Sequence, residues 1–220
     1  MATQSIEDYI KAIFQLSRLG AAVQTSALAE RLDVRPASVS NMLRRLASLG
    51  LIKYKPYHGA LLTAEGETLA RHMVRRHRLI ERFLTVCLDY PWEEVHEEAE
   101  RLEHAVSPRF VEALDRLLEN PLTDPHGAPI PAPDGTMEEP TYPSLAELGQ
   151  GERATVRRVK ENDAGLLRYL RKVGIRPDVE IRVLDRAARD GTVTVRFDGR
   201  TCHLGKSAAT GVFVERLGKC

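Results

Sequence analysis

The spacing of hydrophobic residues divides the chain into a helical first part and a final part in which apolar residues alternate. Residues 4 to 19 place apolar side chains at helical spacing, among them Ile6, Ile10 and Ile13, which predicts an amphipathic helix. Residues 66 to 89 keep this spacing over many turns, and their apolar side is too broad for an exposed helix in a lone small domain. We therefore expect a mainly α-helical N-terminal part with a large buried face.

Two shorter helices are predicted between these segments, over residues 25–34 and 35–50. The second begins with Pro36 at its first position, where the missing N–H costs nothing. Two short helices joined by a few residues form a helix-turn-helix, and small polar and cationic side chains suit a major groove. The DNA contacts that we expect from this second helix are Arg35, Pro36, Ala37, Ser38, Ser40, Asn41 and Arg44.

Residues 51 to 66 are predicted to form two short strands around a Pro56–Gly59 turn. Such a hairpin would carry a basic wing that contacts phosphates. The wing residues are Lys53, Lys55, Tyr57 and His58. A helix, a helix-turn-helix and a basic hairpin in this order predict a winged-helix DNA-binding domain; the alternative is any helical domain followed by a hairpin.

The stretch from Val95 to Pro108, read as a helix, is rich in groups that can bind a metal. Glu100, Glu103 and His104 fall at i, i+3 and i+4, so they lie on one face, and His96 is one turn earlier. Upstream, His77 and Glu81 repeat the pairing of imidazole and carboxylate at i, i+4. Facing helices that each offer such ligands hold metals in bundles. The alternative is a solvated charged face.

The rest of the chain gives the domain organisation. A helix after Ser107 and Pro108 completes a helical dimerisation unit, and residues 121–143, dense in proline and glycine, predict a linker or an ordered surface loop. Residues 144–220 alternate with period two and predict a small antiparallel barrel with one short helix. We therefore expect a winged helix at 1–72, a metal-binding and dimerisation domain at 73–143, and a β domain at 144–220.

Composition and net charge limit the kind of DNA-binding surface and the cellular compartment that we expect. The 220 residues carry a formal net charge of only +1, so a DNA-binding surface must be a local patch. Cys87, Cys202 and Cys220 are widely spaced, which indicates a reducing compartment, and we expect Cys87 to be a buried apolar residue. The sequence has no membrane-length apolar run and no signal peptide, so we expect a cytoplasmic protein without a membrane partner.

Taken in order, these motifs resemble the diphtheria toxin repressor family of metal-activated transcription regulators, in its manganese-responsive branch. The resemblance rests on EDYIKAIFQL, RPASVSNMLRRLASLGLI, YKPYHGALLTAEG, HRLIERFL, VHEEAERLEHAVS and DPHGAPIP. It implies a mainly α protein with a small SH3-like, FeoA-like β domain. It also implies a homodimer that binds double-stranded operator DNA and controls genes of metal homeostasis, with the metal as corepressor.

The resemblance also implies a principal metal site. This site would consist of Asp8, Glu100, Glu103 and His104, with His77 close by. Iron-type members have Met in place of Asp8 and Cys in place of Glu100. Exchanging both sulfurs for carboxylates favours a harder ion, and the expected cofactor is therefore Mn²⁺. Some manganese regulators have a Glu where this chain has Lys11, and a cation there argues against a paired-metal site.

A second metal site is implied in one of two forms. The iron-type pattern would use His77, Glu81 and His96. Manganese-type members with a third domain draw instead on the linker and barrel, which here means Glu81, Asp124, His126 and Asp163. The family often has Cys at the position of Asp124. The alternative for the DPHG sequence is a turn in which Asp124 caps the backbone.

Three other functions compete with a manganese regulator. One is a regulator of the same family that responds to Fe²⁺ or another divalent metal. Another is a metalloenzyme, because His96 and Glu97 begin an H-E-x-x-H pattern, but position 100 is Glu and no nucleophile motif or phosphate loop appears. We therefore expect no small-molecule substrate. The third is a winged-helix regulator that senses something other than metal.

Overall fold

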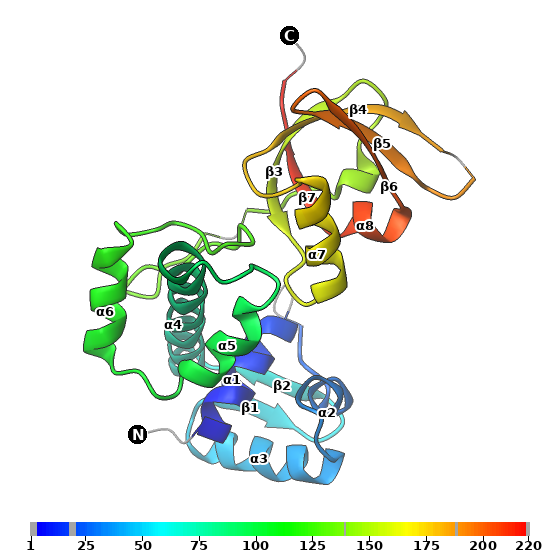
Figure 1. Ribbon diagram of the computed structural model, residues 1–220. Coiled ribbons are helices and arrows are strands. Elements are labelled where there is room, and N and C mark those ends of the chain that lie inside the picture. Colours follow the sequence, from blue (N-terminus) through cyan, green and yellow to red (C-terminus); the bar gives the residue numbers. More distant parts are fainter. Residues whose placement is uncertain (1–3, 18–20, 139, 188, 219–220) are drawn as a thin grey trace. The chain divides into compact units, whose positions relative to one another are not determined.

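The computed structural model describes residues 4–17, 21–138, 140–187 and 189–218. The chain divides into two compact units. Their helices and strands are labelled in Figure 1. The first unit comprises Met1–His77 and Pro131–Met137, and the second comprises Arg78–Ile130 and Glu138–Cys220.

The first unit is a winged helix-turn-helix, as the sequence predicts. Its elements are α1 (Gln4–Leu16), α2 (Thr25–Leu32), α3 (Pro36–Ser48), β1 (Ile52–Lys55) and β2 (Gly59–Leu62). The two strands pair antiparallel, and Val23 adds a bridge to Ala60. Ile10, Leu28 and Leu43 are fully buried between the three helices, so the core lies on one face of α3 and leaves its other face exposed.

Helix α4 (Ala64–Leu88) begins in the first unit and ends in the second. Charged residues recur along it, and it buries Met73, Leu79 and Ile80. Of the helices that the structure describes, none is long and apolar enough to span a bilayer.

Two further helices follow in the second unit, α5 (Val95–Leu102) and α6 (Pro108–Leu117). Helix α6 starts as predicted, because the Ser107 hydroxyl accepts the Phe110 N–H at 3.3 Å and Pro108 takes the first position. Buried residues of α4, α5 and α6 form a small core with Ile80, Leu84, Val95, Ala99 and Leu114.

The C-terminal part of the second unit is a five-stranded sheet with two helices. Its elements are the 3₁₀ helix η1 (Leu145–Glu147), β3 (Arg153–Val159), α7 (Ala164–Val173), β4 (Glu180–Arg186), β5 (Val193–Phe197), β6 (Arg200–Leu204), α8 (Lys206–Thr210) and β7 (Val212–Arg216). The strand order is β6-β5-β4-β3-β7 and every pair is antiparallel. The predicted antiparallel β domain is confirmed. Closure into a barrel is not, since the pairings of the described strands leave β6 and β7 at the edges.

Part of the segment predicted as a linker or an ordered surface loop is packed into the protein. Residues 124–128 are buried in the second unit, where the Val159 N–H donates to the His126 carbonyl at 2.9 Å. Residues 131–137 belong to the first unit, where Arg75 donates to the Pro131 carbonyl at 2.6 Å. Hydrogen bonds from outside the segment therefore hold it in place, as expected for the ordered one of the two predicted alternatives.

The expectation for Cys87 is wrong, because this residue is exposed. It lies in the last turn of α4, where Val86 and Leu88 are also more than half exposed. Cys202 is partly buried, and Cys220 lies outside the described residues.

Candidate functional site

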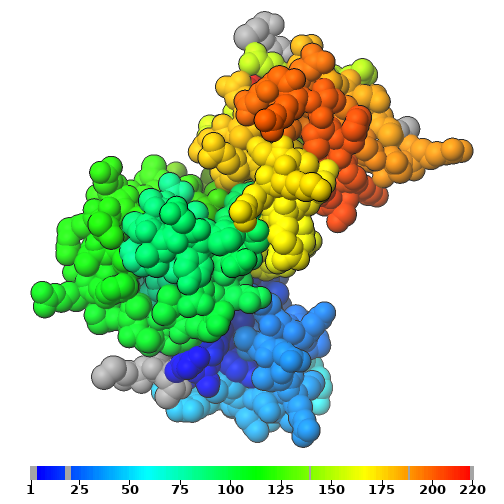
Figure 2. Space-filling model, viewed as in Figure 1, coloured from blue at the N-terminus to red at the C-terminus, as the bar shows by residue number. Residues whose placement is uncertain are grey.

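Helix α3, the predicted DNA-recognition helix, presents its polar side to solvent. Val39, Leu43 and Leu46 are fully buried on one face of α3, which turns the intervening residues outward. The light-blue atoms of this region lie at the surface of the first unit in Figure 2. Of the predicted contacts, Ser40 is partly buried and the others, Arg35, Pro36, Ala37, Ser38, Asn41 and Arg44, are exposed.

The side chains on this surface are already ordered. The Arg44 guanidinium donates to the Asn41 Oδ1 at 2.7 Å, so the two groups extend from α3 together. The N–H groups of the amide and the guanidinium can donate to base edges, and those of the guanidinium also to phosphates.

The wing residues are also exposed, for a reason that lies in the hairpin. Lys53 and Lys55 alternate along β1 with the more buried Ile52 and Tyr54. Tyr57, at the tip, is 98% exposed and has a left-handed φ of 64°. Backbone pairing therefore fixes a hairpin in which Lys53, Lys55, Tyr57 and His58 are all exposed.

The acidic stretch after Trp92 forms a shorter helix than predicted. Helix α5 ends at Leu102, and Glu103 is its C-cap, although the Glu103 N–H still donates to the Ala99 carbonyl at 2.9 Å. Glu100 lies on the helix and His104 in the turn that follows. Glu103 is fully buried, and its Oε1 lies 3.5 Å from the His104 Nε2.

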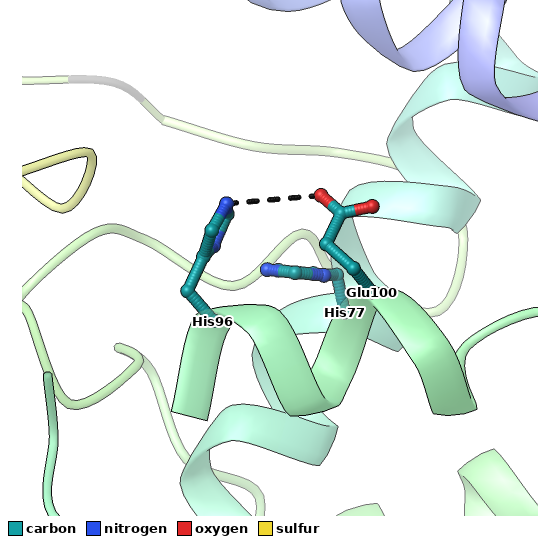
Figure 3. Close-up of side chains that lie close together, drawn as sticks. All are labelled: His77, His96 and Glu100. Carbon is teal, nitrogen blue, oxygen red and sulfur yellow. Dashed lines mark ion pairs between the residues drawn. The ribbon is translucent and has the colours of Figure 1, made fainter. Parts of the chain in front are cut away.

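His96 lies between two carboxylates of the second unit. Its Nδ1 lies 3.1 Å from the Glu81 Oε1 of α4, and its Nε2 lies 3.7 Å from the Glu100 Oε1 of its own helix. Figure 3 shows this second ion pair, together with His77 of α4. In the first unit, Asp8 is partly buried on α1, and the His77 Nδ1 lies 3.0 Å from the Lys11 Nζ.

Three of the predicted ligands meet inside the second unit. Glu81 from α4 and Asp124 and His126 from the following segment each place one ligand atom within 4.8 Å of the others. We call these three residues the inner group. All three are at most 1% exposed. Among the residues that the structure describes, the Asp124 Oδ2 and the His126 Nδ1 have no hydrogen-bond partner, although both atoms are buried.

The backbone holds the two linker residues so that these atoms stay available. The Asp124 Oδ1 accepts the N–H groups of His126 and Ala128 at 2.8 and 2.9 Å, so the turn considered above as the alternative does form. It occupies only one carboxylate oxygen. The His126 Nε2 lies 2.8 Å from the Trp92 carbonyl, which accepts its proton and leaves the Nδ1 with a lone pair. The rings of Trp92 and His126 also stack, with centroids 5.8 Å apart.

Because the inner group is buried, its carboxylates need a positive charge nearby to stay ionised. The pKa of Asp124 is raised to about 6, chiefly by desolvation and also by the carboxylates of Glu81 and Glu161, while Arg78 and His126 act to lower it. The Arg78 Nε is 3.6 Å from the Asp124 Oδ2. Two buried carboxylates and an imidazole with a free lone pair form a donor set that fits a divalent cation.

One predicted ligand is not in this group. Asp163 is not one of the three residues whose ligand atoms lie within 4.8 Å of one another; it is the N-cap of α7, where its Oδ1 accepts the Leu166 N–H at 2.9 Å. Two further residues were not predicted from the sequence: Glu161, whose charge acts on Asp124, and Trp92, whose carbonyl orients His126. The only indication for Glu161 in the sequence was that it is an acidic residue two positions before the predicted ligand Asp163. A backbone carbonyl gives no signal in sequence.

Family models cover most of the chain. The model described as the iron dependent repressor N-terminal DNA binding domain matches residues 1–60. The metal binding and dimerisation domain of the same repressors matches residues 63–132, and the FeoA domain matches residues 144–216.

Known proteins are similar over nearly the same length. The iron-dependent repressor IdeR of Mycobacterium tuberculosis is 33% identical over 224 residues, covering 96% of both chains. The diphtheria toxin repressor of Corynebacterium efficiens is 30% identical, covering 96% of this chain and 95% of its own. A solved manganese-dependent transcriptional repressor in complex with manganese is 40% identical with a TM-score of 0.87, covering 96% of this chain and all of its own. The chain therefore belongs to the diphtheria toxin repressor family, whose members are metal-dependent transcriptional repressors and not enzymes.

Proposed function

We propose that this chain is a repressor for which Mn²⁺ is the corepressor. The observation that carries the proposal is the inner group, in which buried Glu81 and Asp124 face the Nδ1 lone pair of His126. Its donors are oxygen and nitrogen, without sulfur. Carboxylate oxygen suits Mn²⁺, whereas thiolate ligands favour softer ions. Among the solved structures, identity is also higher to a manganese-dependent repressor, at 40%, than to the IdeR of T. acidophilum, at 27%.

The inner group would hold one ion through the Asp124 Oδ2, the His126 Nδ1 and a Glu81 carboxylate oxygen. Support for this role comes from the hydrogen bond of the His126 Nε2 to the Trp92 carbonyl. Histidine ligands usually give their second ring N–H to such an acceptor, which fixes the ring for metal binding. Glu161 is the candidate for a further ligand, in place of Asp163.

A principal site would draw on Asp8 of the first unit and on Glu100, Glu103 and His104 of the second. Three carboxylates and one imidazole neutralise a divalent ion and contain no sulfur. The family resemblance supports this set. In the second unit, the 3.5 Å approach of Glu103 to His104 gives two of its donors as neighbours.

This division of ligands suggests how metal controls DNA binding. Asp8 is in the unit that carries α3, and the other donors are in the unit that carries the dimerisation helices. Ligation by both would fix the orientation of α3, and two copies of α3 in a dimer must match a half-site spacing of about 34–36 Å. To shift the protein from mostly unable to mostly able to bind DNA, the metal must favour the DNA-binding conformation by roughly 5 kcal/mol.

The dimer itself is supported by apolar side chains at the surface of the second unit. A lone subunit exposes large hydrophobic residues of the dimerisation helices and their loops, and a second copy would cover them. These residues are Val86, Leu88, Tyr90, Phe110, Leu117 and Leu122.

The test is DNA binding by metal-stripped, full-length protein with each divalent metal added at a buffered free concentration. The DNA would be selected from a random duplex pool in the presence of Mn²⁺. Trp92 is the only tryptophan of the chain and stacks on His126, so its fluorescence reports the inner group separately. We expect Mn²⁺ to restore DNA binding and to change this fluorescence. Activation by Fe²⁺ alone would make the chain an iron regulator, and binding that needs no metal would reject metal sensing.

A further inference from the structure

The C-terminal β domain is the more basic part of the chain. Residues 144–220 contain 16 lysine and arginine residues against 10 aspartate and glutamate residues, whereas residues 1–143 contain 16 against 21. The small net charge of the whole chain is therefore the sum of a positive C-terminal part and a negative remainder. Such an asymmetry points to a polyanionic partner, and the winged helix does not explain it because it lies in the other part.

Three of the positive charges form a row across the C-terminal sheet. In the antiparallel register, Arg153 of β3 lies opposite Arg182 of β4, and Arg182 lies opposite Arg196 of β5. All three arginines are exposed. The residue that follows each of them belongs to the core, which also contains Leu167 and Leu170 of α7. Successive side chains of a strand point to opposite faces, so the row lies on the face of the sheet that α7 does not cover.

This row is unfavourable for the domain by itself, because like charges directly opposite each other on neighbouring strands destabilise a sheet. Arg153 is compensated by Glu180, since the Arg153 guanidinium lies 3.1 Å from the Glu180 carboxylate. Among the residues that the structure describes, Arg182 and Arg196 have no ion pair and no side-chain hydrogen bond. Two neighbouring guanidinium groups are therefore left with all their N–H donors available to a ligand.

We propose that this face of the C-terminal sheet binds the phosphate backbone of duplex DNA, as a second DNA-binding surface besides α3 and the wing. Arginine holds phosphate through two parallel N–H···O bonds, and a phosphate between Arg182 and Arg196 would offset their mutual repulsion. Thr201 of the edge strand β6 lies opposite Arg196 and is exposed, so its hydroxyl can donate to a further phosphate oxygen. Contacts of this kind add affinity without sequence preference.

Duplex DNA suits the row better than an acidic protein surface does. DNA carries closely spaced negative charges along its whole length, and the family to which this chain belongs binds DNA through its N-terminal domain. The acidic surface within reach of every copy is the dimerisation region of a second copy. Two of its glutamates are already paired within their own chain, Glu93 with Arg171 at 2.8 Å and Glu98 with Arg101 at 3.2 Å.

The test is the salt dependence with which full-length protein binds a labelled duplex of random sequence, measured by fluorescence anisotropy. Arg182→Gln combined with Arg196→Gln should lower the slope of log affinity against log salt by about 0.9 for each lost phosphate contact, or about 1.8 in all. Arg168→Gln combined with Lys172→Gln is the matched control, because it removes the same charge from exposed positions of α7, against the other face of the sheet. The control should keep the wild-type slope. A sheet variant with the slope of the control would overturn the proposal.

Urea unfolding and sedimentation separate DNA binding from the other roles that the two arginines could have. Because the arginines repel each other, the sheet variant should unfold at the same urea concentration as wild type or at a higher one. A wild-type slope in a less stable variant would assign the arginines to the fold. A wild-type slope with a changed sedimentation coefficient would assign them to contacts between copies, and either result would overturn the proposal.

The same series is run with Mn²⁺ and with a chelator, because neither arginine belongs to a proposed metal site. The difference in slope between the sheet variant and its control should appear under both conditions. DNA binding that does not respond to Mn²⁺ would reject the proposed corepressor, while the comparison of slopes would still test the C-terminal sheet.

Discussion

His126 shows how one side chain serves both the fold and the site. Its backbone carbonyl accepts the Val159 N–H, its backbone N–H is held by Asp124, and its ring donates to the Trp92 carbonyl. Only the Nδ1 lacks a hydrogen-bond partner among the described residues. A ring held at so many points keeps one orientation before any ion arrives, which lowers the cost of ordering a ligand on binding.

The carboxyl group of Asp124 makes both the stability of the metal-free fold and metal binding depend on pH. Burial raises its pKa to about 6 from the ordinary value of 3.8, so between these values the folded metal-free protein holds more protons than the unfolded chain. Stability of the metal-free fold therefore falls as pH rises through this window. Metal binding has the opposite sign, because Asp124 must first lose its proton.

We predict that Mn²⁺ binding at the inner group weakens as pH falls through about 6 and releases a proton below that pH. Calorimetry in buffers of different ionisation enthalpy measures this release, and Trp92 fluorescence follows the binding. Asp124→Asn should bind less tightly and lose the proton release. An affinity that is independent of pH from 5 to 7 would remove Asp124 from the ligands.

Arg44 gives a second prediction for a single residue. It is exposed on α3 and paired with Asn41, so Arg44→Ala should weaken DNA binding. If the guanidinium meets a phosphate, the slope of log affinity against log salt should fall by about 0.9 for each phosphate that the variant no longer neutralises. Arg168→Ala, which removes an exposed arginine of α7, is the control and should leave the slope unchanged. Wild-type affinity for Arg44→Ala at every salt concentration would remove the residue from the DNA-binding surface.

The segment that holds Asp124 and His126 depends on one glycine for its place against β3. Gly127 has a φ of +87°, and a Cβ there would lie 1.9 Å from the Arg157 carbonyl oxygen. The close approach of the two backbones permits the hydrogen bond between Val159 and His126. The position of both proposed ligands is therefore set by backbone packing, and not only by their own side chains.

Gly127→Ala should consequently both disrupt this packing and weaken Mn²⁺ binding at the inner group. The matched control is Gly151→Ala, since Gly151 has a φ of +85° but a Cβ there would meet nothing within 4 Å. We expect Gly151→Ala to cost roughly 1 kcal/mol from the backbone conformation, and Gly127→Ala about 2 kcal/mol more from the clash. Urea unfolding followed by Trp92 fluorescence measures both. Equal decreases in stability, with Mn²⁺ binding intact in both variants, would contradict this view of the segment.

Sequence predicted the regular elements well, because their apolar spacing and caps are local signals. Ser107 and Pro108 start α6 as expected, and the alternating segment after residue 144 forms antiparallel strands. Helix α5 ends earlier than predicted, at Leu102, since acidic spacing alone does not say where a helix stops. The segment from Asp124 to Ala128 was harder still, because its order comes from hydrogen bonds with residues far away in the chain.

At the scale of the whole molecule, the three residues of the inner group could be predicted from the sequence, but their proximity in the fold could not. Glu81 and Asp124 lie more than forty residues apart, and only the fold brings them within 4.8 Å of each other. Asp163 is not among them and caps a helix, and the charge of Glu161 acts on Asp124. The exposed Cys87 is explained by another property of the whole molecule, since the end of α4 carries apolar residues that we expect a second copy to cover.

The central claim is that carboxylate donors make Mn²⁺ the corepressor. The most direct test measures operator affinity against free Mn²⁺, Co²⁺ and Fe²⁺, under anaerobic conditions, for wild type and Glu100→Cys. Thiolate is a poor ligand for Mn²⁺ and favours later metals, so the variant should need about tenfold more Mn²⁺ and less Co²⁺ or Fe²⁺ for the same DNA binding. Circular dichroism confirms that the variant folds. Metal curves for Glu100→Cys that coincide with those of wild type would contradict the account.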